Sequence, residues 1–179
     1  ELEALAPAKL VIEAIIEELA IKRSLFLRLE AICDPACILA SNTSSLSISA
    51  IASPLARPER LVGMHFFNPA PVMQLVEVVS GIATEPEIAE RVRLTAENWG
   101  KRPVLTKSTP GFIVNRVARP FYAEALRLLE EGAADCASID AVARGSGGFP
   151  MGPFELMNVT GVPIALHAAT TLGETLGPF

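Results

Sequence analysis

A histidine and a glutamate lie in two neighbouring apolar segments of the sequence. His65 falls near the end of Leu61–Phe67, and Glu77 lies within Leu75–Val79. Both segments have the length and composition of buried strands. A buried carboxylate is costly without a partner. If the strands are neighbours, Glu77 can hold one imidazole nitrogen while the other nitrogen takes a proton. The pair predicts general-base chemistry, and a purely structural His–Glu hydrogen bond is the alternative.

A second group of polar residues stands where a strand gives way to a helix. Asn42, Thr43, Ser44 and Ser45 follow the short apolar run Ile38–Ala40. Hydroxyls and free backbone N–H groups at such a junction suit an anionic or carbonyl group. Simple capping of the following helix is the alternative.

Several other residues have a chemical and a structural interpretation. Asn115 lies one turn into a predicted long helix, where its amide can hold a ligand or make an interdomain hydrogen bond. Lys22 follows Glu18 by one helical turn, which predicts a weak surface ion pair. His167 lies in an apolar stretch and is interpreted as structural.

Composition limits the class of protein. The 179 residues are half apolar, with 20 acidic against 15 basic side chains, which is typical of a globular protein with a large core. The acidic balance argues against a nucleic-acid partner. Three cysteines and two histidines, in spacings unlike a zinc motif, predict no metal site and reduced thiols. No signal peptide or membrane anchor is expected, and the expected location is cytoplasmic.

Hydrophobic periodicity predicts two domains with a boundary near residue 108. Residues 1–108 are predicted as α/β, in the order β-α-β-α-β-β-α-β, with a largely parallel sheet and a first strand buried on both faces. Within this part, Thr84–Glu87 is predicted to be a capping box that opens a helix. Residues 109–179 are predicted as all-α: a helix over 112–131 kinked at Pro120, a short helix through Ile139, and helix again from Pro153.

Five motifs, in order along nearly the whole chain, resemble the L-3-hydroxyacyl-CoA dehydrogenase family, which includes the 3-hydroxybutyryl-CoA dehydrogenases. The motifs are Ser41–Ser45, Met64–Pro69, Leu75–Val78, Pro110–Arg116 and Met151–Leu156.

The resemblance implies the C-terminal half of a Rossmann-type NAD domain, followed by a helical domain that binds substrate and forms a homodimer. It implies NAD-dependent oxidation of an L-3-hydroxyacyl-CoA to the 3-oxoacyl-CoA, a reaction of fatty-acid β-oxidation. By motif position, His65 would be the general base and Glu77 its orienting carboxylate. Ser44 would bind the reacting oxygen and Asn115 the acyl-CoA carbonyl region. The positions that would contact NAD are Glu17, Lys22, Ser44 and Asn68.

One family feature is missing from the sequence. No Gly-rich GxGxxG turn, nor the acidic residue that follows it, is present in the 179 residues. We therefore expect the chain to be a fragment whose first half of the NAD domain lies upstream, and to be inactive alone. The alternatives are a non-catalytic dimerisation or acyl-CoA-binding module, and a related dehydrogenase of free hydroxy acids.

Overall fold

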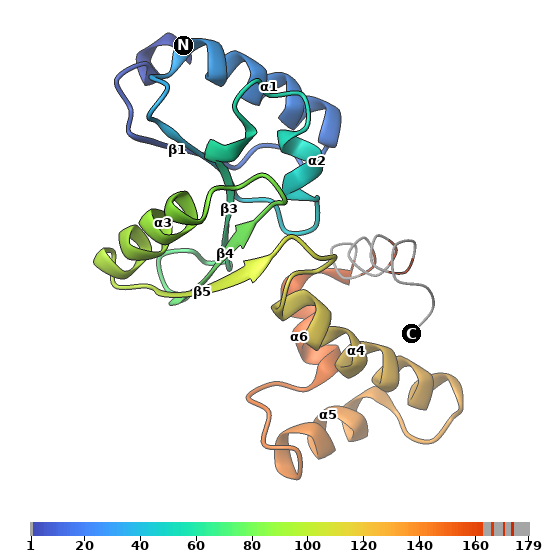
Figure 1. Cartoon of the computed structure of the whole chain (residues 1–179). Helices are drawn as coiled ribbons and strands as arrows, with labels where there is room; N and C mark the ends of the chain where they lie inside the picture. The colour runs from blue at the N-terminus through green and yellow to red at the C-terminus, as the bar shows by residue number, and fades with distance from the viewer. Residues whose placement is uncertain (1, 163–165, 167–169, 171–172, 174–179) are drawn as a thin grey trace. The chain divides into compact units, whose positions relative to one another are not determined.

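The computed structural model describes residues 2–162, 166, 170 and 173 (Figure 1). The chain divides into two compact units, residues 1–112 and residues 113–179. His167, which entered the sequence predictions, lies outside the described residues.

The first unit is built on a five-stranded sheet with the order β1-β2-β3-β4-β5. The strands are β1 (Leu10–Glu13), β2 (Ile38–Ser41), β3 (Leu61–Phe66), β4 (Leu75–Ser80) and β5 (Arg102–Lys107). All neighbours pair in parallel except β3 and β4, which are antiparallel. The segment between β3 and β4 is too short for the crossover that a parallel pair requires. The predicted largely parallel sheet is therefore confirmed, with one antiparallel pair.

Three helices cover both faces of this sheet. They are α1 (Leu19–Ile32), α2 (Ile48–Ala52) and α3 (Pro86–Asn98), with short 3-10 turns at η1 (Leu2–Leu5) and η2 (Pro58–Arg60). Alternate strand residues point to opposite faces. Leu39, Leu61 and Val79 thus join the cluster against α1 and α2, whereas Val62 and Val78 join the cluster against α3. The α/β prediction for this unit is confirmed.

The fold corrects two local predictions. The predicted capping box at Thr84 is wrong: Glu85 precedes α3 without a side-chain cap bond. The Thr84 hydroxyl instead donates to the Leu61 carbonyl (2.6 Å) and accepts from the Gly81 N–H (2.9 Å). Strand β1 is also not buried on both faces. Val11 and Glu13 are buried, but the alternate residues are half-buried because β1 lies at one edge of the sheet.

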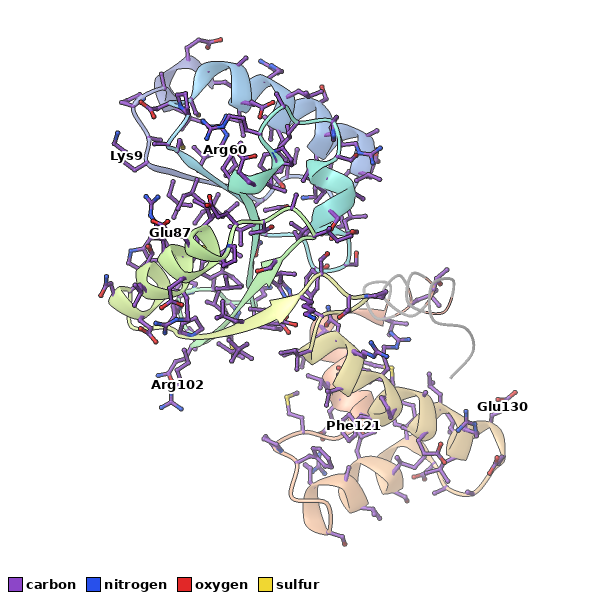
Figure 2. The ribbon with its side chains drawn as sticks, viewed as in Figure 1. Lys9, Arg60, Glu87, Arg102, Phe121 and Glu130 are labelled. Carbon is purple, nitrogen blue, oxygen red and sulfur yellow. The ribbon has the colours of Figure 1, made fainter. Side chains whose placement is uncertain are left out.

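A tight contact fixes how α2 lies on the sheet. Gly63 of β3 faces Val79 of β4 and Ile48 of α2, and a Cβ at this position would lie 2.7 Å from the Val79 Cβ. Arg60 holds the C-terminal end of α1 (Figure 2). Its guanidinium donates to the carbonyls of Asp34 (2.8 Å) and Glu30 (3.2 Å).

The second unit contains helices only among its described residues. They are α4 (Val114–Glu130), α5 (Cys136–Gly145) and α6 (Pro153–Thr160), which confirms the all-α prediction. Buried Asp140 of α5 accepts from the N–H groups of Phe154 (2.9 Å) and Glu155 (3.1 Å), and so caps α6. Pro120 lies inside α4, and the predicted kink there stays a prediction.

The three cysteines are all free thiols. Cys33 and Cys37 are buried and Cys136 is exposed. Burial raises the pKa of the Cys37 thiol to about 11, with a further contribution from neighbouring Cys33. In the part of the chain that the structure describes, no helix is both long and apolar enough to cross a lipid bilayer.

Candidate active site

The pairing of β3 with β4 brings His65 and Glu77 together. The two residues are directly opposite each other in the antiparallel register. The imidazole Nδ1 lies 2.7 Å from Glu77 Oε2, with His65 only 6% exposed and Glu77 fully buried. The antiparallel pairing of the two strands therefore places the Glu77 carboxylate next to the His65 ring.

This contact fixes the tautomer of the imidazole. A carboxylate offers only acceptor oxygens, so Nδ1 carries the proton and donates it to Glu77. The second nitrogen, Nε2, is then the acceptor and is able to take a proton. A proton taken up at Nε2 would place the resulting imidazolium beside the negative charge of Glu77. The geometry is that of an oriented general base.

Two aromatic rings contact the imidazole. The Phe67 ring centroid lies 4.5 Å from that of His65, in a tilted arrangement. The Phe112 ring lies 5.7 Å away and meets the imidazole edge to face. Apolar rings exclude water, which strengthens the hydrogen bond between Nδ1 and the carboxylate.

The polar segment after β2 is organised by a carboxylate from elsewhere in the chain. Oxygen Oε1 of Glu17 accepts from the Thr43 hydroxyl (2.5 Å), and from the N–H groups of Ser44 (2.9 Å) and Ser45 (3.1 Å). The Ser44 and Ser45 hydroxyls lie 3.3 Å and 3.2 Å from the same oxygen. In this structure these donors surround the carboxylate of Glu17, and contact of the segment with a ligand stays a prediction.

Capping of α2, the alternative for this segment, is provided by a later residue. Ser47 is the N-cap, and its hydroxyl accepts from the Ala50 N–H (3.2 Å). Asn42 is used differently: its Oδ1 accepts from the Phe66 N–H (2.8 Å), which ties the end of β2 to the end of β3.

The environment of Glu17 favours its charged form. Burial raises the pKa of Glu17, but the hydrogen bonds from Thr43 and Ser44 and the nearby charge of Lys22 outweigh burial. The pKa of this carboxyl therefore lies below its ordinary value.

Lys22 forms a buried ion pair with Glu13 and also contacts Glu17. The Lys22 ammonium lies 2.6 Å from Glu13 Oε1 and 3.3 Å from Glu17 Oε2. The other oxygen of Glu13 accepts from the Ser41 hydroxyl (2.7 Å). Lys22 is only 1% exposed. The predicted surface pair with Glu18 is therefore wrong for the described residues, because the side chain points into the protein.

Sequence reasoning missed Glu13 as a member of this network. The signal was present, because Glu13 is a carboxylate within an apolar strand, as Glu77 is. A buried carboxylate in such a run requires a partner, and Lys22 is that partner.

The remaining candidates lie at other positions. Asn68 is exposed and follows β3, in a loop that Lys101 holds through the carbonyls of Ala70 (2.5 Å) and Met73 (2.9 Å). Asn115 lies in the first turn of α4, in the second unit. In the same unit, α4 and the segment before α6 line an apolar groove of about 710 Å³ that includes Phe121 and Phe149, but not Asn115.

The carboxyl ends of parallel strands are the ligand-binding edge of open α/β sheets. Here Glu13, Ser41 and Phe66 end β1, β2 and β3 at one such edge, where the His–Glu pair and the Glu17 network also lie. The fold and the site together define a nucleotide-binding α/β protein with an added helical unit.

Comparison with known families agrees with this class. Residues 1–109 match the family described as 3-hydroxyacyl-CoA dehydrogenase, NAD binding domain. Residues 111–178 match the family described as 3-hydroxyacyl-CoA dehydrogenase, C-terminal domain. The chain belongs to the 3-hydroxyacyl-CoA dehydrogenase family, as its motifs predict.

Individual relatives are similar over most of this chain. The 3-hydroxyadipyl-CoA dehydrogenase of Escherichia coli K12 is 56% identical over 161 residues, which are 90% of this chain and 34% of the relative. A probable 3-hydroxybutyryl-CoA dehydrogenase of Bacillus subtilis is 46% identical over 176 residues, 98% of this chain and 61% of the relative. A crystal structure of 3-hydroxybutyryl-CoA dehydrogenase from E. coli K12 has a TM-score of 0.95 at 52% identity, covering 97% of this chain and 37% of that one. The chain thus spans between about one third and three fifths of the length of these proteins.

Proposed function

We propose that the protein containing this chain oxidises an L-3-hydroxyacyl-CoA to the 3-oxoacyl-CoA with NAD. Membership of the family supports the reaction class. The observation that carries the proposal is the buried His65–Glu77 hydrogen bond of 2.7 Å, at the ligand-binding edge of the sheet. It supplies the base that removal of a hydroxyl proton requires.

In this reaction His65 is the general base. Its Nε2 takes the proton of the substrate 3-hydroxyl while the C3 hydride leaves, so that the alcohol becomes a ketone. Glu77 holds the ring and stabilises the imidazolium, and Ser44 donates a hydrogen bond to the reacting oxygen. Bound NAD supplies the hydride acceptor. Asn115 is proposed to hold the acyl-CoA carbonyl region.

The polar groups at the edge fit part of the nucleotide. Glu17, Ser44 and Asn68 offer carboxylate, hydroxyl and amide groups, which suit a nicotinamide carboxamide and ribose hydroxyls. Lys22 is enclosed between Glu13 and Glu17, so in this proposal it acts on the nucleotide through Glu17. The set includes no Gly-rich turn for a pyrophosphate.

The wider setting is part of the same proposal. The helical part, residues 109–179, binds acyl-CoA and forms the homodimer contact in the intact protein. Three free thiols are in keeping with a cytoplasmic location.

Substitution of the base tests the proposal. In the intact protein, His65→Gln is expected to lower kcat by roughly 10²–10⁴-fold and leave NAD affinity nearly unchanged, because only proton transfer is lost. His167→Gln, at the other histidine of the sequence, is the matched control. Turnover that survives His65→Gln would contradict the proposal and favour a non-catalytic module. Comparison of 3-hydroxyacyl-CoA with free 3-hydroxy acids tests the substrate class.

A further inference from the structure

Phe112 combines an unfavourable backbone conformation with contact to the proposed base. Its φ is +47°, the one positive value at a non-glycine position among the described residues. Residues other than glycine rarely adopt this backbone conformation, because the Cβ crowds the backbone. Strain of this kind persists only where surrounding contacts enforce it, and it concentrates at functional sites.

The surrounding contacts are visible on both sides of Phe112. The Phe112 N–H donates to the Thr109 carbonyl (2.9 Å), closing a turn with Gly111 at φ +71°. Just before this turn, Ser108 donates its N–H to Ser80 of β4 (2.8 Å) and accepts from the Ile48 N–H of α2 (2.9 Å). The segment is therefore tied to the sheet and to α2, and the turn directs Phe112 inward.

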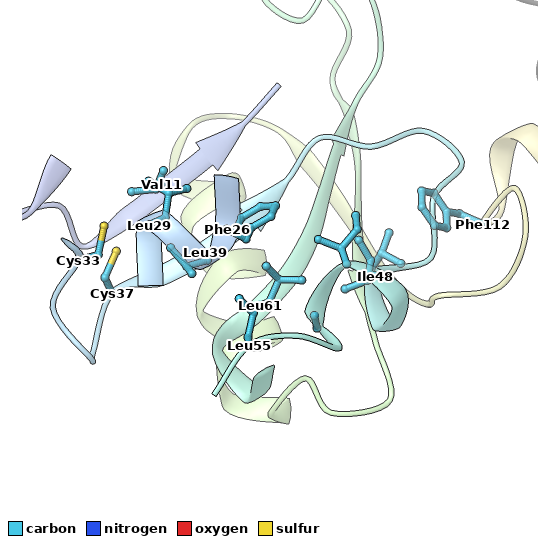
Figure 3. Close-up of a cluster of buried hydrophobic side chains, with 13 residues drawn as sticks. Val11, Phe26, Leu29, Cys33, Cys37, Leu39, Ile48, Leu55, Leu61 and Phe112 are labelled. Carbon is cyan, nitrogen blue, oxygen red and sulfur yellow. The ribbon is translucent and has the colours of Figure 1, made fainter. Parts of the chain in front are cut away.

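The side chain of Phe112 is directed at one end of the core. It is 3% exposed and belongs to the cluster under α1 and α2. Figure 3 shows Phe112 at one end of this cluster, with Cys33 and Cys37 at the other end. At its own end, the Phe112 ring meets the His65 imidazole edge to face.

A single hydrogen bond does not fix an imidazole completely. The ring turns about the Cβ–Cγ bond, a torsion that is soft for histidine, and the Nδ1 hydrogen bond to Glu77 tolerates part of this rotation before it weakens. Contact on the ring surface removes this freedom. Phe67 comes from the same strand segment as His65 and is half-buried, whereas Phe112 is buried and is held from a separate, anchored segment.

We propose that Phe112 is a positioning residue for His65: its ring sets the plane of the imidazole and thereby the direction of Nε2. The consequence for turnover rests on the proposed function. The contact itself does not, so the two are tested separately.

The contact is tested by proton exchange at the hydrogen-bonded Nδ1–H of His65. This proton gives a downfield NMR signal in the 179-residue chain, assigned by its loss in His65→Gln. Phe112→Leu removes the ring and keeps an apolar side chain. We expect exchange of the Nδ1 proton with water to accelerate by about tenfold or more, because the imidazole samples open positions. Phe112→Tyr keeps the ring and is expected to keep the slow exchange.

Phe26→Leu is the matched control. Phe26 is fully buried in the same cluster, on α1, whereas the ring contacts found for the imidazole are with Phe67 and Phe112. Loss of the Phe26 ring therefore weakens the core and leaves those two contacts in place. We expect exchange in Phe26→Leu to match the unsubstituted chain. Equal acceleration in Phe26→Leu and Phe112→Leu would overturn the positioning role and leave a core residue. If circular dichroism shows that Phe112→Leu does not fold, the exchange rate is measured in Phe112→Met instead, with the same expected acceleration.

Kinetics of the intact protein give the second measurement. Misplacement of a reacting group lowers kcat, whereas loss of nucleotide contacts raises KM. We expect Phe112→Leu to lower kcat by about 10- to 100-fold and to change the KM for NAD by less than about twofold. Phe26→Leu is expected to keep kcat. Normal kcat in Phe112→Leu, together with a lowered kcat in His65→Gln, would overturn the positioning role. Normal kcat in His65→Gln would overturn the proposed function alone, and the exchange measurement would then decide the positioning role.

Discussion

The charged residues at the carboxyl ends of β1 and β2 form a chain of contacts. Glu13 holds Lys22 and Ser41, Lys22 also contacts Glu17, and Glu17 holds the Ser44 segment. A buried ion pair adds little stability as a whole, but removal of one partner leaves the other charge buried without a counter-ion. This cluster therefore serves to place Glu17 more than to stabilise the fold.

Removal of the cation tests this arrangement. Lys22→Met is expected to lower the free energy of unfolding by about 3–5 kcal/mol, because Glu13 is left buried without its counter-ion. Urea unfolding followed by circular dichroism measures the change. The double substitution Glu13→Gln with Lys22→Met is expected to recover much of the loss. Additive losses in the double variant would contradict a coupled pair.

Glu17 predicts a pH dependence of stability. Its pKa is lower in the folded chain than its ordinary value of 4.5, so the folded state holds the charged form more strongly than the unfolded state does. This contribution is complete above about pH 4.5 and is lost as the pH falls through the lowered folded value. We expect Glu17→Gln to flatten the acid side of the stability profile, measured by urea unfolding between neutral and acid pH.

A neighbouring substitution controls for loss of one negative charge. Glu18 is adjacent to Glu17 and exposed, so Glu18→Gln removes a carboxylate without removing the hydrogen bonds from Thr43 and Ser44. Identical profiles in Glu17→Gln and Glu18→Gln would contradict a specific role of the Glu17 contacts.

At the level of elements, the packing of α2 on β3 and β4 depends on one missing side chain. A Cβ at Gly63 would lie 2.7 Å from Val79 Cβ and 2.9 Å from Ile48 Cδ1. We expect Gly63→Ala to destabilise the chain by about 1–3 kcal/mol, because two packed elements must move apart. Gly145→Ala, where nothing lies within 4 Å of the new Cβ, is the control. Equal melting temperatures for the two variants would contradict the packing argument.

The sequence predicted the strands and longer helices because their periodicity is local. Residues 38–41, 61–66 and 86–98 fold as expected. It also predicted the His65–Glu77 contact on the condition that the two strands are neighbours, and the pairing of β3 with β4 meets that condition. Contacts that depend on topology were not accessible: Glu17 meets Ser44, and Lys22 turns inward, only once β1 and β2 pair. The left-handed Phe112 had no signal, because its conformation is imposed by packing.

At the scale of the whole chain, the polar groups that we propose to contact NAD suit only one part of a dinucleotide. Glu17, Ser44 and Asn68 offer no phosphate site, and no Gly-rich turn is present in the sequence. A backbone cradle for the pyrophosphate is a main anchor for dinucleotides in such folds. The 179 residues alone are therefore expected to bind NADH with an affinity of about millimolar or weaker.

Fluorescence titration of the 179-residue chain with NADH measures this affinity. The matched measurement is the intact protein, which is expected to bind far more tightly. No acetoacetyl-CoA-dependent oxidation of NADH is expected from the chain alone. Micromolar binding or measurable turnover by the 179 residues would contradict this expectation.

The three thiols differ in burial, so their reactivity reports on the unfolding of the first unit. Cys136 stands on the surface of the second unit, whereas Cys33 and Cys37 lie in the core of the first. A thiol reagent such as a disulfide dye should therefore label one cysteine at once, and the other two only as fast as the sheet core exposes them. The slow phase would time the unfolding of the first unit without any introduced probe.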